Sequence, residues 1–256
     1  MALLVIRDVV PTFVEAREAA RGLAYESIVE AVRKAETVRM GIYLGERRIG
    51  QTTTEIRPRR DGSCDIVSRT NLVLGAMGLP FDTTAQYEAH VGPDRKLVSF
   101  DAHLLSSGTQ IARITGKVVG NELHLILSLG EREEARVVPV DARYLISDSL
   151  ATGLRMPDLY VGRQWRVRAL DIPALALGQI RLQEGTARVV RQEELLWAGE
   201  YIPCYVVELS WPNLAATAWV NEAGEVLQQK AGVMTFVREQ TSENQSQAEC
   251  SVGSDG

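Results

Sequence analysis

The sequence predicts a mainly β protein built on a large curved antiparallel sheet or open half-barrel, with an N-terminal helix and a short mid-chain helix. Short extended runs alternate with turn-forming Gly, Asn, Asp and Pro along most of the chain. Hydrophobic residues make up 45% of the 256 residues and charged residues 24%, enough apolar material for a sizeable core. We expect a helical segment over 1–39, one β domain over 40–238 and a disordered tail over 239–256.

The N-terminal helix is expected over 10–37. Pro11 suits a first helical turn, and Thr12 with Glu15 three residues later matches a capping box. Apolar residues then recur at near-helical spacing, with Glu and Arg between them. Gly22 costs this helix about 1 kcal/mol relative to alanine.

From Met40 onward, turn signals separate pairs of extended runs. These signals include Gly45-Glu46, Gly92-Pro93-Asp94, Gly120-Asn121 and the stretch 221–224. About ten to twelve strands with such short turns indicate an open or half-closed antiparallel barrel or a large curved sheet. A jelly roll or sandwich is the alternative architecture. The expected strands lie within 40–56, 64–69, 87–91, 97–105, 111–119, 123–129, 136–140, 164–171, 178–183, 186–196, 201–210, 215–220 and 225–230.

Residues 141–156 break this rhythm. Tyr144, Leu145, Leu150 and Leu154 suit a short amphipathic helix, with a proline just beyond as its stop. Residues 239–256 are polar almost throughout, so they cannot offset the entropy of ordering, and we expect a disordered tail.

The sequence carries no signature of catalysis or of a cofactor. The net charge of −5 gives no overall attraction to nucleic acid, and no apolar run reaches the ~18 residues of a membrane span. No phosphate-binding glycine loop or nucleophile elbow is present. His90, His103 and His124 fall in expected strands, on the solvated face, without metal-ligand spacing. We therefore expect a non-enzyme without metal or cofactor.

Cysteine is sparse. Cys64 and Cys204 either form one bridge or stay as buried thiols, and the sequence leaves both open. Cys250 falls in the expected tail.

Aromatic residues gather in the second half of the chain. In a curved sheet they either line a concave apolar surface that holds a ligand or fill the core. The residues expected to line such a surface are Trp165, Trp197, Tyr205 and Trp219.

Residues 40–54 hold an extended run, a Gly-Glu-Arg-Arg-Ile-Gly hairpin and a threonine-rich strand. This pattern resembles the β-rich region that precedes the catalytic domain in some bacterial transglutaminase-like proteins. Val98-Ser-Phe-Asp, Gly116-Lys-Val-Val-Gly and Ala218-Trp-Val-Asn-Glu-Ala-Gly extend the resemblance over residues 40–238. It also resembles half-barrel envelope proteins of the lipoprotein-carrier type, which implies a curved sheet with helices at its mouth. No catalytic Cys–His–Asp set carries over to this chain.

The leading hypothesis is a non-catalytic binding or accessory domain that holds an apolar or peptide-like ligand on a concave sheet, or regulates a separately encoded enzyme. The second is a structural or interaction module of an envelope-associated assembly that uses exposed strand edges. The third is an enzyme of unrecognised type. As written, the chain is expected to be cytoplasmic, and envelope-associated if its true N-terminus lies upstream.

Overall fold

The computed structural model describes residues 35–76, 79–140, 146–147, 155–156, 158–170, 182–212 and 214–240. These residues form a single 15-stranded sheet. The strands are β1 (Glu36–Leu44), β2 (Arg47–Pro58), β3 (Cys64–Ala76), β4 (Leu79–Val91), β5 (Leu97–Ser106), β6 (Thr109–Val119), β7 (Glu122–Leu129), β8 (Arg132–Pro139), β9 (Ile146–Ser147), β10 (Gln164–Leu170), β11 (Leu182–Trp197), β12 (Glu200–Trp211), β13 (Leu214–Asn221), β14 (Val226–Ala231) and β15 (Met234–Arg238).

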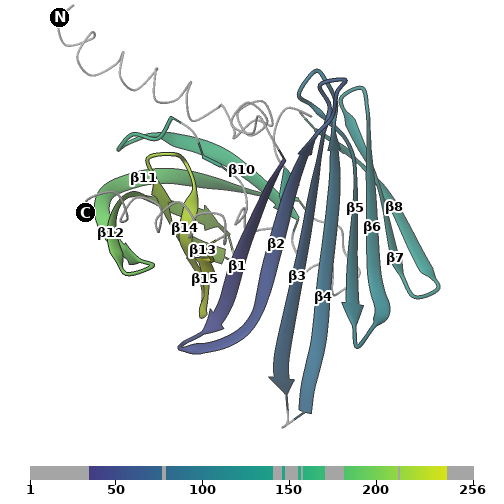
Figure 1. Cartoon of the computed structure of the whole chain (residues 1–256). Coiled ribbons are helices and arrows are strands. Elements are labelled where there is room, and N and C mark those ends of the chain that lie inside the picture. Colours follow the sequence, from purple (N-terminus) through teal and green to yellow (C-terminus); the bar gives the residue numbers. More distant parts are fainter. Residues whose placement is uncertain are drawn as a thin grey trace, which may run out of the picture.

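The strand order follows the chain in two runs. Strands β8 back to β1 form one half of the sheet, and β15 back to β9 form the other. Neighbouring strands are antiparallel except for β9, which runs parallel to β10. Figure 1 shows the long strands β2 to β8 side by side, while β11 and β12 bend strongly around the other half. The predicted large, curved, mainly antiparallel open sheet is confirmed.

Alternation along the strands separates two faces of the sheet. In β7, Leu123, Leu125 and Leu127 are buried, while His124 and Ile126 between them are exposed. The buried residues of most strands join one continuous apolar cluster. We call the face that carries this cluster the inner face and the opposite one the outer face.

β12 changes its buried face along its length. Val207 belongs to the main cluster of the inner face. Cys204 and Val206 are also buried but lie outside that cluster, as does Leu227 of β14. A break in the β11–β12 register between Val189 and Arg191 accompanies this change. The far end of the β11–β12 hairpin thus packs through its outer face.

β1 and β15 join the two halves through a ladder of five residue pairs. At one end of this ladder, Arg155 and Arg238 each pair with both Glu36 and Glu225, at N–O distances of 3.0 to 3.5 Å. The four side chains are partly buried, so the network is shielded from much of the solvent.

The two predicted helices are wrong wherever the structure describes them. Residues 36–37, expected at the end of the first helix, begin β1 instead. The reason is that buried Val38 and Met40 stand on either side of an exposed residue, the two-residue period of a strand and not the spacing of a helix. Within 141–156, residues 146–147 form β9 and Arg155 makes an isolated bridge to Glu225. Residues 1–34, most of 141–154 and the tail from 241 lie outside the described residues. No helix in the described part is long and apolar enough to cross a membrane.

Candidate functional site

The four aromatic residues expected to bind a ligand lie on two different faces. Trp165 is buried in the inner cluster, and Tyr205 packs against that cluster. Trp219 is the cross-strand partner of Val206 on the outer face, and its indole N–H donates to Glu193 Oε1 at 2.5 Å. The indole N–H of Trp197 donates to the backbone oxygen of Arg238 at 2.9 Å. The four side chains therefore do not line one surface.

Both described cysteines are free and buried. Burial raises the pKa of the Cys204 thiol to about 11, with the nearby Glu193 carboxylate adding to the effect. Burial also raises the pKa of Cys64. Both thiols are therefore protonated at neutral pH and poor nucleophiles.

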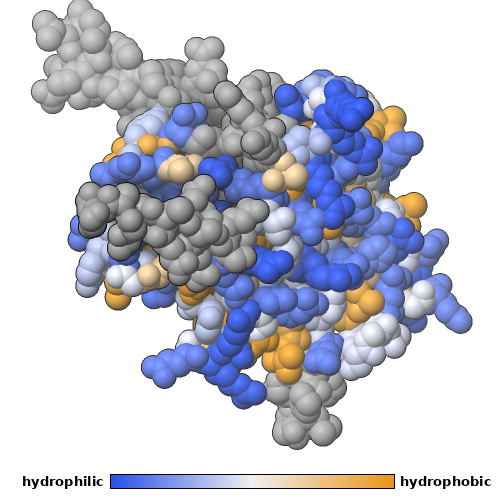
Figure 2. Space-filling model, viewed as in Figure 1, coloured by the Kyte–Doolittle hydropathy of each residue, from blue (hydrophilic) through white to orange (hydrophobic). Residues whose placement is uncertain are grey.

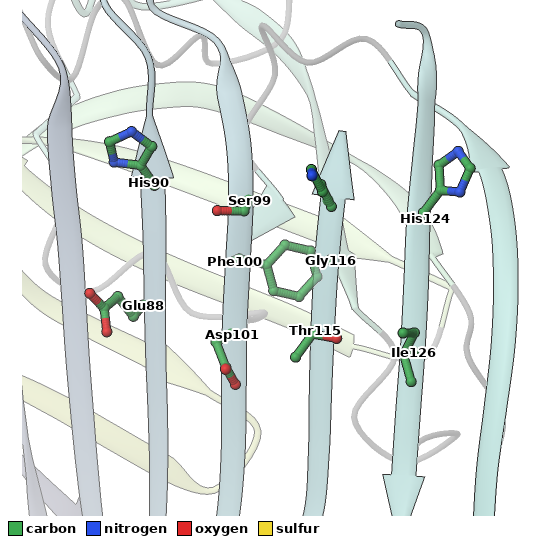
Figure 3. A pocket seen from close by; sticks show the side chains of 10 residues that line it. Glu88, His90, Ser99, Phe100, Asp101, Thr115, Gly116, His124 and Ile126 are labelled. Carbon is green, nitrogen blue, oxygen red and sulfur yellow. The ribbon is translucent and has the colours of Figure 1, made fainter. Parts of the chain in front are cut away.

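The outer face of β4 to β7 carries a groove of about 560 Å³ (Figure 3). Four cross-strand neighbours on its upper side supply hydrogen-bond donors, and we call them the donor row: His90, Ser99, Lys117 and His124. The next row along the strands contains two carboxylates, and we call it the acidic row: Glu88, Asp101, Thr115 and Ile126. Side chains two residues apart along a strand point to the same face, so both rows border the same groove.

The floor of the groove is thin at Gly116. A Cβ at this position would lie 2.2 Å from Cε1 of Phe100, so the phenyl ring sits directly against the glycine. Phe100 is buried in the inner cluster on the far side. Any larger residue at 116 would displace this ring.

One end of the donor row is fixed by a carboxylate. His90 Nδ1 lies 2.8 Å from Asp65 Oδ1, and Arg59 Nε donates to Asp65 Oδ2 at 2.6 Å. Burial raises the pKa of Asp65, but the hydrogen bonds from His90 and Arg59 outweigh it and hold the pKa below its usual value. Asp65 is therefore ionised at neutral pH and orients the imidazole of His90.

The two charged rows are only partly neutralised by the protein itself. Asp101 accepts a hydrogen bond from Arg113 at 2.6 Å and lies 2.8 Å from His103 Nε2. Among the described residues, Lys117 and Glu88 make no ion pair. A cation and an anion therefore face the groove with their charges available to a ligand.

Ser99 and His90 are cross-strand partners beside Asp65, which sets three catalytic residue types in one row. A serine nucleophile needs its hydroxyl within hydrogen-bond reach of the histidine base. Among the described contacts, His90 bonds to Asp65 and none joins it to Ser99. The row is better suited to binding charged groups than to activating a nucleophile.

The sequence placed the histidines on the solvated face, and the structure confirms this for His90 and His124 in the groove. The sequence did not predict that these histidines lie beside Ser99, Lys117 and Glu88. The available signal was the turn Gly120-Asn121, whose two-residue loop fixes the register of β6 against β7 and sets Lys117 opposite His124.

Comparison with known proteins establishes a fold and no family. The structure resembles that of a β-barrel-like protein of domain of unknown function DUF1849 from Brucella abortus, with a TM-score of 0.56 and 11% identity over 81% of this chain and 96% of that one. A DUF1089 family protein from Pseudomonas aeruginosa matches with a TM-score of 0.39 and 18% identity over 69% of this chain and 87% of that one. No family model and no curated protein matches the sequence. The first likeness shows a shared β-barrel-like fold, while the transglutaminase-like and lipoprotein-carrier resemblances stay predictions.

Proposed function

We propose that the chain is a non-catalytic binding domain that holds a peptide-like ligand in the groove on the outer face of β4 to β7. The observation that carries this proposal is the pair of oppositely charged rows along one groove. Lys117 represents the cationic side and Glu88 the anionic side, and neither has an ion-pair partner among the described residues.

The spacing of the two rows suits an extended peptide. The rows are two residues apart along each strand, which corresponds to about 6.8 Å. Alternate side chains of an extended peptide have the same separation and point the same way. Lys117 on β6 and Glu88 on β4 are two strands as well as one row apart, about 12 Å in all. A peptide that crosses β4 to β6 obliquely, with long acidic and basic side chains, would set an acidic group near Lys117 and a basic group near Glu88.

The test is an NMR titration with the tripeptide Glu-Ala-Lys. We expect amide shifts confined to 88–90, 99–101, 115–117 and 124–126, the four segments that border the groove. Lys117→Gln is expected to weaken binding about fivefold, the effect of one exposed charge pair. Lys96→Gln, which changes a lysine in the β4–β5 turn paired with Asp94, is the matched control and should bind as the unmodified chain does. Shifts elsewhere, or equal losses in both variants, would contradict the proposal.

An interaction module that uses strand edges is the second hypothesis, and the described edge strand β8 favours it less. β8 carries Arg132, Glu133, Glu134 and Arg136 and ends at Pro139. Charges and proline on an edge discourage the addition of another strand. Figure 2 also shows the hydrophobic residues of the visible face scattered among hydrophilic ones rather than gathered into one patch.

A further inference from the structure

Exposed apolar side chains gather at one end of the outer groove. Val119 of β6, Ile126 of β7 and Val137 of β8 are 53%, 45% and 51% exposed. They surround His124, because Val137 is its cross-strand partner and Ile126 follows it two residues along β7, as Figure 3 shows. We call these three residues the apolar end of the groove. Contact with them removes apolar surface from water, which favours a ligand with an apolar group there.

A lysine without an ion-pair partner among the described residues stands next to the apolar end. Lys117 is the cross-strand partner of His124. His124 Nε2 itself lies 3.4 Å from Glu122 Oε2, so this carboxylate has a partner other than Lys117. Ser99 adds a hydroxyl donor on the other side of Lys117. The ammonium and the hydroxyl are therefore placed to donate to an anion of the ligand.

The last residue of a peptide chain supplies both an anion and an apolar group when its side chain is apolar. The α-carboxylate and the side chain are attached to the same Cα, so they lie close together. Lys117 and Ile126 are diagonal neighbours on one face, about 7–8 Å apart. The carboxylate can therefore reach Lys117 while the side chain lies against Ile126 and Val137. An internal Asp or Glu brings a carboxylate without an apolar group on the same residue.

Glu88 adds a second requirement. It lies about 12 Å from Lys117, across β4 to β6. An extended peptide covers about 6.8 Å in two residues, and a long basic side chain two positions before the C-terminus spans the rest. Asp101 lies between them, but Arg113 and His103 already contact its carboxylate. Glu88 is therefore the carboxylate that is available to a basic side chain of the ligand.

We propose that the groove binds the C-terminal end of a peptide whose last residue is apolar and whose residue two positions earlier is basic. The α-carboxylate accepts hydrogen bonds from Lys117 and Ser99, and the last side chain covers Ile126 and Val137. This inference rests on the proposed function, because it specifies which peptides the same groove binds.

The test compares three peptides by NMR titration of the unmodified chain: acetyl-Lys-Ala-Leu with a free carboxylate, the same peptide as its C-terminal amide, and acetyl-Lys-Ala-Ser with a free carboxylate. We expect the amide and the serine peptide each to bind about fivefold more weakly than the first, because one lacks the charge and the other the apolar contact. Equal affinity of either one with acetyl-Lys-Ala-Leu would overturn this inference, while shifts confined to the groove would still support the proposed function. Binding of none of the three would overturn both.

Matched double variants locate the apolar contact. Ile126→Thr with Val137→Thr should weaken binding of acetyl-Lys-Ala-Leu about fivefold and leave that of acetyl-Lys-Ala-Ser unchanged. The control is Ile111→Thr with Val73→Thr, which changes a similarly exposed isoleucine and valine of β6 and β3 that do not line the groove. Equal losses in the two double variants would contradict the inference. The peptide comparison uses the unmodified chain, so it decides the question even if a variant unfolds.

Discussion

Gly50 lies in β2 with no room for a side chain. A Cβ at this position would come within 2.1 Å of the backbone oxygen of Asn71 in the neighbouring strand. Backbone in a paired strand cannot move aside cheaply, so we expect Gly50→Ala to lower the free energy of unfolding by about 2 kcal/mol or more. Urea denaturation followed by circular dichroism measures this loss.

Gly41 in the adjacent strand provides the control. There a Cβ would meet the ring of Tyr43 at 2.8 Å, the far end of a side chain that can rotate away. We expect Gly41→Ala to cost less than about 1 kcal/mol. Equal losses in the two variants would show that the contact with the Asn71 backbone is not the cause.

Asp65 makes stability depend on pH. Because its pKa is lowered in the folded state by His90 and Arg59, its contribution is present above the unfolded pKa of about 3.9 and is lost as pH falls through the folded value. We expect Asp65→Asn to cost about 1–3 kcal/mol at pH 7, and the difference from the unmodified chain to shrink at pH 3. Urea midpoints at the two pH values test this, and an unchanged difference would contradict it.

At the scale of elements, the β11–β12 hairpin has an unfavourable residue at its tip. Ala198 and Gly199 join Trp197 to Glu200, and both have positive φ, 54° and 89°. Such a two-residue turn favours Asn-Gly, because alanine is strained in the left-handed region. We expect Ala198→Asn to raise the free energy of unfolding by about 0.5–1 kcal/mol, seen as a higher urea midpoint with an unchanged slope. Ala198→Val should lower it, and a gain from both variants would refute the turn geometry as the reason.

Turns were the most predictable elements of the fold. Gly45-Glu46, Gly92-Pro93-Asp94 and Gly120-Asn121 each connect neighbouring strands as expected. Gly185 shows where a turn was expected wrongly. It separated two expected runs, 178–183 and 186–196, yet it lies inside β11, where the indole of Trp211 occupies the space of its missing side chain. A glycine required by tertiary packing has the same local appearance as a turn glycine.

The candidate site was predictable only in part. Alternation assigns His90 and His124 to the solvated face, but their neighbours depend on exact register. A break between His90 and Val91 in the β4–β5 ladder sets Ser99 opposite His90, and such an irregularity has no clear local signal. The sequence grouped Trp165 with Trp219 for the same reason. The buried face changes along β12, so the two side chains lie on opposite faces of the sheet, and the sequence has no clear signal for this change.

At the scale of the whole molecule, the ion-pair network of Glu36, Arg155, Glu225 and Arg238 ties together residues far apart in the sequence. Removing one cation leaves two partly buried carboxylates undercompensated. We expect Arg238→Met to cost about 1–3 kcal/mol in urea denaturation. Arg113→Met, which breaks the more exposed pair with Asp101, should cost less than about 1 kcal/mol. The reverse order would refute a structural role for the network.

The two edges of the described sheet, β8 and β9, are consecutive in the chain. A cut between Val140 and Ile146 therefore leaves every described ladder within one fragment or the other, except the one between β1 and β15. We therefore expect two separately expressed fragments, one with β1 to β8 and one with β9 to β15, to bind each other. The affinity of the two fragments for each other would measure the strength of the contact between β1 and β15. Arg238→Met should lower this affinity.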